Sequence, residues 1–289
     1  MKTLSYEVVD VFTDRPFTGN PLAVVFGADG LASEQMQALA REFHLSETVF
    51  LLPPTGAATY RARIFTPEEE LPFAGHPSVG AAVTGLRRGL FAAGDVVQEC
   101  GAGLLTVHVS AEGRARLTGG QPTVGAELDP APLLEVVGLS TADFIGPPPR
   151  AASCGLEFHY LPVRPDAVPR AAGAPTVARR HGIPTVSVFA WDPATATART
   201  RVFCPGVGVP EDPATGSAAL GFGVWLVASG LLPGDGESAY TVRQGVELHR
   251  PSTLECTVTA RDGAAVSTTV TGQVVPIARG EITVPPFIG

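Results

Sequence analysis

An internal repeat constrains the fold of this chain more than any other feature of its sequence. Residues 61–67 (RARIFTP) and 199–205 (RTRVFCP) both follow the pattern R-x-R-[IV]-F-x-P. An acidic turn follows each copy, and a glycine then opens a run of small residues of equal length in the two halves. The repetition predicts two structurally equivalent halves. The alternative is a pair of unrelated strand–turn–helix units, which any α/β protein can contain.

Composition excludes several classes of protein. The chain has 289 residues, enough for two domains or one large one, and a net charge of −8. A hydrophobic content of 45% argues against long disorder, and the acidic balance argues against a nucleic-acid partner. We expect no transmembrane helix, because no apolar run reaches the required length, and no signal peptide, because acidic residues interrupt the N-terminal segment. A cytoplasmic protein is the resulting expectation.

Periodicity and turn residues predict alternating short strands and a few helices. Helices are expected from Glu34 to Phe43 with Ser33 as the cap, from Pro77 to Arg88, and from Ala214 to Ala228. The Gly/Pro-rich segment 119–132 is the expected domain boundary. The expected strands are residues 6–12, 22–26, 48–52, 58–65, 96–100, 104–109, 115–118, 156–163, 185–190, 200–203, 253–260, 264–271 and 281–285.

The two glycine-opened helix starts are the best candidates for a binding site. Helix N-termini present unpaired N–H groups and partial positive charge, so two of them would suit a carboxylate. Gly75 and Gly216 would admit a ligand close to the backbone, and His76 and Ser217 follow them in register. The simpler interpretation, a helix-capping histidine and a plain N-cap serine, stays open on the residues alone.

Five ordered segments resemble the PhzF family of phenazine-biosynthesis isomerases, which is related to diaminopimelate epimerase. They are DVFTDRPFTGNPLAVV (10–25), LSETVF (45–50), ELPFAGHPSVGAA (70–82), EDPATGSAA (211–219) and QGVELHRPS (244–252). The resemblance implies an α+β fold of two pseudo-symmetric domains, each a mostly antiparallel, barrel-like sheet around a central helix. It implies an N-terminal domain of residues 1–120 plus 276–289, a C-terminal domain of residues 121–275, and an active site between them.

The resemblance also assigns roles to residues. It implies that Glu47 is the acid/base that moves a proton between carbons, with Asp212 and His76 as further catalytic residues. The implied substrate-binding residues are Asn20, Ser46, Gly75, Thr215, Gly216 and Ser217. On its own, Glu47 would be a surface glutamate at a strand end. Its place before the apolar run 48–52 favours a base in a region of low dielectric, as proton abstraction from carbon requires.

The chain departs from the epimerase relatives at their two catalytic cysteines, which align with Ala74 and Thr215, so a two-thiol mechanism is disfavoured. Three hypotheses remain: a proton-moving isomerase, a racemase or epimerase using Glu47 and Asp212, and a non-catalytic binding protein on the same scaffold. We expect a small carboxylate-bearing substrate, no cofactor, no metal, no nucleic-acid or membrane partner, and a homodimer. The cysteines are widely spaced and are expected to be buried hydrophobic residues: Cys100, Cys154, Cys204 and Cys256.

Overall fold

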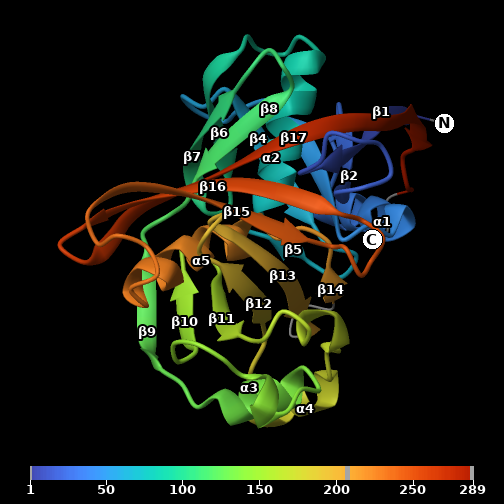
Figure 1. Cartoon of the computed structure of the whole chain (residues 1–289). Coiled ribbons are helices and arrows are strands. Elements are labelled where there is room, and N and C mark those ends of the chain that lie inside the picture. The colour runs from blue at the N-terminus through green and yellow to red at the C-terminus, as the bar shows by residue number, and fades with distance from the viewer. Residues whose placement is uncertain (1, 206–208, 287–289) are drawn as a thin grey trace. The chain divides into compact units, whose positions relative to one another are not determined.

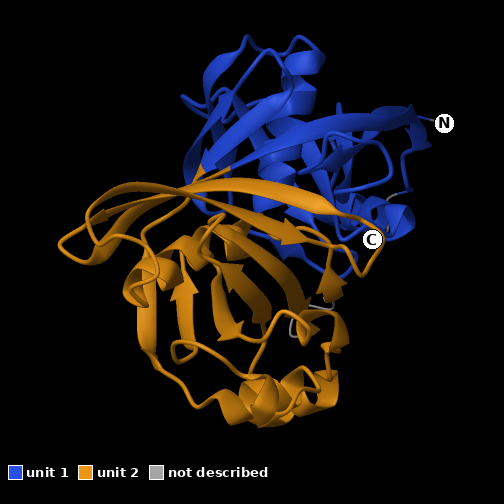
Figure 2. Ribbon diagram, in the orientation of Figure 1, with its two compact units in different colours: residues 1–117, 271–289 blue, residues 118–270 orange. Residues whose placement is uncertain are grey.

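The computed structural model describes residues 2–205 and 209–286. The chain divides into two compact units, which Figure 2 shows in separate colours. Unit 1 comprises residues 1–117 and 271–289, and unit 2 comprises residues 118–270. The C-terminal segment therefore belongs to the unit that contains the N-terminus.

Unit 1 is built from short strands with one helix at its centre and one at its edge (Figure 1). Its elements are β1 (Thr3–Val11), β2 (Asn20–Phe26), α1 (Ser33–Phe43), β3 (Glu47–Leu52), β4 (Tyr60–Phe65), β5 (Glu70–Leu71), α2 (Gly75–Arg87), β6 (Gly94–Cys100), β7 (Gly103–Val109), β8 (Arg114–Thr118) and the C-terminal part of β17 (Ala264–Thr283).

The strands of unit 1 close into a barrel. Antiparallel pairs join β1 to β2, β3 to β4, β6 to β7 and β7 to β8, whereas β2–β3 and β4–β6 are parallel. Strand β17 pairs with β1 on one side and with β8 on the other, which closes the ring. The closure removes free sheet edges from this part of the chain.

Unit 2 has the same kinds of element (Figure 1). They are β9 (Thr123–Glu127), α3 (Pro130–Val136), the 3₁₀ turn η1 (Thr141–Asp143), β10 (Arg150–Ser153), β11 (Glu157–Pro162), the 3₁₀ turn η2 (Val168–Arg170), α4 (Pro175–His181), β12 (Val186–Asp192), β13 (Thr197–Cys204), β14 (Val209–Asp212), α5 (Gly216–Ala228), β15 (Gly236–Gln244), β16 (Ser252–Arg261) and the first part of β17.

The strand pairing of unit 2 repeats that of unit 1. Strands β10–β11, β12–β13 and β15–β16 are antiparallel, and β11–β12 and β13–β15 are parallel, in the same succession as β1 to β7. The match extends to register: Ile64 pairs with Leu71 between β4 and β5, and Val202 pairs with Asp212 between β13 and β14. The predicted α+β fold of two pseudo-symmetric halves is therefore confirmed.

Each unit packs its sheet around one helix of 13 residues, α2 in unit 1 and α5 in unit 2, and both helices are buried except at the C-terminal end. Small residues make this possible, because a helix inside a barrel has no solvent-facing side. In α5, Gly221 and Gly223 leave notches where an added Cβ would lie 2.5 Å from the hydroxyls of Tyr160 and Tyr240. Those hydroxyls donate to helix carbonyls at 2.7 Å, so the notches serve polar as well as apolar packing.

The structure corrects the expected beginnings of all three helices. The two central helices begin at Gly75 and Gly216, not at Pro77 and Ala214. Ser33 is the first residue of α1 and not its cap. The N-cap is Ala32, whose N–H donates to the side chain of Gln35 at 3.1 Å. The Ser33 hydroxyl instead accepts a hydrogen bond from Arg63.

Two other segments contain regular structure that the sequence analysis did not assign. The Gly/Pro-rich stretch 119–132 contains β9 and the start of α3. Strand β9 pairs with β10 although all of its residues are exposed. The expected strands 264–271 and 281–285 are one continuous strand, β17. Pro276 fits within it because a β-bulge opposite Val8 and Val9 interrupts the ladder there.

Gly272 allows β17 to pass the strained, fully buried Phe12, whose φ is +65°. A Cβ added at Gly272 would lie 2.3 Å from the Phe12 ring. We expect Gly272→Ala to lower the free energy of unfolding by about 1–3 kcal/mol through overpacking. Urea denaturation measures this. Gly56→Ala is the matched control, because a Cβ there meets nothing within 4 Å. Equal stability of the two variants would contradict the packing argument.

Candidate active site

Four predicted site residues meet at the start of α2 in unit 1. Asn20 is the first residue of β2, Glu47 is the first residue of β3, and Ser46 precedes it. These two strands run parallel, so their first residues lie at the same edge of the sheet. His76, the second residue of α2, lies against them with its Nε2 atom 3.6 Å from Glu47 Oε2.

A chain of hydrogen bonds orients the His76 ring. The Ser46 hydroxyl donates to Asn20 Oδ1 at 3.1 Å, which leaves the Asn20 amide nitrogen facing His76 Nδ1 at 3.3 Å. Because an amide nitrogen can only donate, Nδ1 is the accepting atom of the ring. The network therefore assigns the Nε2–H tautomer to neutral His76 and directs that N–H toward Glu47.

Burial keeps His76 neutral. The side chain is 4% exposed, and desolvation lowers the pKa of His76 to about 3. Near pH 7 the imidazole is therefore uncharged, and its Nε2 atom is 3.6 Å from Glu47 Oε2, beyond hydrogen-bond distance. Glu47 is 15% exposed, so the pair combines a sheltered carboxylate with a neutral N–H donor.

A second set of predicted residues meets at the start of α5 in unit 2. The Thr215 hydroxyl donates to Asp212 Oδ2 at 2.6 Å. The amide of Gln244 completes the arrangement: its Nε2 donates to the Asp212 carbonyl at 2.7 Å and to Thr215 Oγ1 at 2.9 Å, and its Oε1 accepts from the Thr215 N–H. Asp212, at the end of β14, is thus tied to the first turn of the helix.

The first residues of the two central helices, with their backbone N–H groups, are buried inside the units. Their N-cap residues are Ala74 and Thr215, and neither side chain caps its helix. His76 and Ser217 are both second residues of a helix, so the capping interpretation of these two side chains is wrong. Gly75 and Gly216 are buried first residues whose N–H groups have no partner within the helix.

Sequence reasoning missed two buried glutamines that anchor these helix starts. Gln244 is 1% exposed, and its signal was its place in the QGVELHRPS segment. In unit 1, Gln98 on β6 donates to the Ser78 hydroxyl, which in turn donates to the carbonyl of Ala74. Nothing in the local pattern of β6 marked Gln98, because its importance arises from a partner in another element.

The cysteines do not supply a thiolate to either set. Cys154, Cys204 and Cys256 are buried, as expected, and Cys100 is half-buried. Burial raises the pKa of the Cys154 and Cys256 thiols, which keeps both protonated near pH 7. Within residues 2–205 and 209–286, no group of three or more His, Cys, Asp or Glu side chains is arranged to hold a metal ion. Among the same residues, none of the helices has the length and apolar character to span a bilayer.

The chain matches known proteins over nearly its whole length. The family model described as "Phenazine biosynthesis-like protein" matches residues 9–280. An uncharacterized isomerase of Mesorhizobium japonicum is 34% identical, over 98% of this chain and 99% of its own. The trans-2,3-dihydro-3-hydroxyanthranilate isomerase of Pseudomonas chlororaphis is 31% identical, over 96% of this chain and 98% of its own.

A solved structure of a PhzF-family protein also resembles this chain. The PhzF-family phenazine biosynthesis protein of Bacillus anthracis superposes with a TM-score of 0.87 at 27% identity, covering 98% of this chain and all of the other. The repeated barrel with a buried central helix thus defines a class of two-unit isomerases. This chain belongs to the PhzF family of phenazine biosynthesis-like proteins.

The neutral state of His76 makes a prediction about stability. Unfolded His76 binds a proton below about pH 6.5 and folded His76 does not above about pH 3, so this group makes stability fall as pH decreases between these values. We expect His76→Gln to lose less stability than the wild type between pH 6.5 and pH 4, measured by urea denaturation. His108→Gln is the control, because His108 is exposed.

A spectroscopic measurement checks the same point directly. Long-range ¹H–¹⁵N correlation spectra at pH 6 should show His76 as the neutral Nε2–H tautomer. A doubly protonated ring at that pH would contradict both the burial argument and the tautomer assignment.

Proposed function

We propose that this protein is a cofactor-independent isomerase that moves a proton between two carbon atoms of a small unsaturated or cyclic amino or hydroxy acid. The observation that carries the proposal is the Glu47–His76 pair: a sheltered carboxylate facing a neutral, oriented N–H donor. A carboxylate of this kind is suited to abstracting a proton from a weakly acidic carbon.

The reaction needs no external reagent. Glu47 takes a proton from one carbon, and the C–H electron pair moves into the adjacent unsaturated system. The same carboxyl group then returns the proton to another carbon, so the substrate and product have the same atoms and Glu47 regains its charge. His76 donates its Nε2–H to the Glu47 carboxylate or to a substrate oxygen and keeps the imidazole uncharged.

The unit 2 residues are proposed to bind the polar groups of a substrate. The buried N–H groups at the start of α5 and the Ser217 hydroxyl, on a residue that is 5% exposed, suit a carboxylate. Asp212 is proposed to accept from an amine or hydroxyl and to relay a proton. Its hydrogen bond from Thr215 holds the carboxylate in one orientation.

The name of the Pseudomonas chlororaphis relative supplies the first compound to test. We would follow trans-2,3-dihydro-3-hydroxyanthranilate by proton NMR in D₂O with the wild type, Glu47→Gln and the exposed control Glu68→Gln. We expect the wild type and the control to change the vinylic and ring signals. Glu47→Gln should lower kcat by about 10²-fold or more, because it removes the acid/base group.

The outcomes separate the hypotheses. Full turnover by Glu47→Gln would overturn the assignment of the acid/base group. Deuterium exchange at a single carbon with inversion of its configuration would identify a racemase or epimerase instead. Binding without any exchange would indicate the non-catalytic alternative. An unchanged spectrum with no binding would exclude this compound as the substrate.

A further inference from the structure

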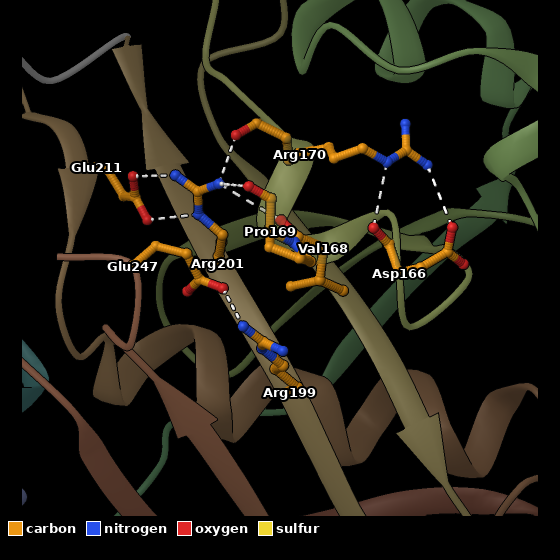
Figure 3. Close-up of polar contacts among 9 residues, drawn as sticks. Asp166, Val168, Pro169, Arg170, Arg199, Arg201, Glu211 and Glu247 are labelled. Carbon is orange, nitrogen blue, oxygen red and sulfur yellow. Dashed lines mark hydrogen bonds and ion pairs between the residues drawn. The ribbon is translucent and has the colours of Figure 1, made fainter. Parts of the chain in front are cut away.

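A buried ion pair lies immediately before Asp212. Arg201 on β13 donates from Nε and Nη2 to the two carboxylate oxygens of Glu211 on β14, at 2.8 Å and 2.6 Å (Figure 3). The two side chains are only 10% and 12% exposed. The third guanidinium nitrogen, Nη1, donates to backbone carbonyls of the segment around η2: Val168, Pro169 and Ala171.

The pair fixes the strand that delivers Asp212. Glu211 is held on both carboxylate oxygens, and the next residue, Asp212, pairs in register with Val202, the neighbour of Arg201. A planar guanidinium fork sets the direction of its partner as well as the distance. The fork therefore holds Glu211, the residue that precedes Asp212. Thr215 and Gln244, which follow Asp212 in the chain, form hydrogen bonds with Asp212.

The same device occurs at the equivalent place in unit 1. Arg63 on β4 donates to both carboxylate oxygens of Glu70 on β5, at 2.7 Å and 2.5 Å. Arg63 and Arg201 occupy the same position of the repeated R-x-R-[IV]-F-x-P pattern, and each paired glutamate comes at the same short distance before the glycine that opens the central helix. The unit 1 pair is more exposed, at 22% and 40%.

Stability alone is a weak explanation for the unit 2 pair. The desolvation cost of two buried charges offsets much of their attraction, and apolar residues of similar volume often stabilise a protein at least as well. What the ion pair adds is geometry, because a fork that makes two parallel bonds permits one relative orientation. Because the ion pair lies next to Asp212, a proposed site residue, the orientation that it fixes also affects the position of Asp212.

We propose that Arg201 and Glu211 are positioning residues, which hold Asp212 and the first turn of α5 in the arrangement that the reaction needs. This inference rests on the proposed function. Neither residue is assigned a contact with substrate, and they act through Asp212. The Arg63–Glu70 pair has the corresponding role for the start of α2.

The test compares two identical substitutions on one strand, Arg201→Lys and Arg199→Lys. Both keep the positive charge, but lysine cannot form the fork. Arg199 is the matched control because its ion pair is a single 2.5 Å contact from an exposed side chain to Glu247, and not a fork to Glu211 (Figure 3). Hydrogen–deuterium exchange of residues 209–217 reports the positioning without any substrate.

We expect Arg201→Lys to speed amide exchange at residues 212–217 by about tenfold or more and Arg199→Lys to leave it unchanged. With trans-2,3-dihydro-3-hydroxyanthranilate, Arg201→Lys should lower kcat by about 10- to 100-fold with a much smaller change in KM, because misplacement of about 1 Å is that costly. Measurements are made well below the melting temperature of each variant, so that loss of folded protein does not imitate the effect.

Wild-type exchange and kcat in Arg201→Lys, or equal losses in both variants, would overturn the proposal. If Arg201→Lys does not fold, Glu211→Gln is measured in the same way, because it keeps the length of the side chain and removes one accepting oxygen. If the wild type does not convert the compound, only the proposed substrate is excluded. The exchange measurement then decides the positioning role by itself.

Discussion

The burial of two helix starts is the constraint on which the rest of this structure depends. A barrel wrapped around α2 or α5 buries the first turn of the helix, whose N–H groups have no partner within the helix. Buried glutamines from neighbouring strands bind near those ends in both units, through the Ser78 hydroxyl in unit 1 and directly to Asp212 and Thr215 in unit 2. Because such an end also attracts negative charge, the proposed function assigns the binding of an anionic substrate to it.

The two units share one arrangement of strands and a central helix, and differences at single residues make the units chemically different. The residue after the glutamate that pairs with arginine is Leu71 in unit 1 and Asp212 in unit 2. The residue after the helix-opening glycine is His76 in one unit and Ser217 in the other. Strand order, register and ion pairs could remain constant while these few positions diverged. Fold and chemistry are thus encoded by largely separate sets of residues.

The repeated motif and the glycine-bounded helices predicted two equivalent halves because each is a local signal, and the resemblance to the PhzF family implied the barrel-like fold of each half. The missed features depend on partners that are distant in sequence. Strand β9 has five exposed residues and pairs with β10, and β17 passes the Phe12 ring at Gly272, where a side chain would not fit. For the site, the helix start marked His76, and the resemblance to the PhzF family marked Glu47. The tautomer of His76 depends on the Asn20 amide and the Ser46 hydroxyl, which only the folded geometry brings together.

The residues at the two N-caps bear on the kind of proton transfer that the protein can perform. Two thiols at equivalent caps can address opposite faces of one carbon, but Ala74 has no titratable group and the Thr215 hydroxyl is committed to Asp212. Under the proposed function, the proton acceptor belongs to a strand, β3, and the same carboxyl group must serve as acceptor and then as donor. A single group of this kind works from one side of the substrate. Such an arrangement suits the transfer of a proton along one face of a conjugated system better than the inversion of a single centre.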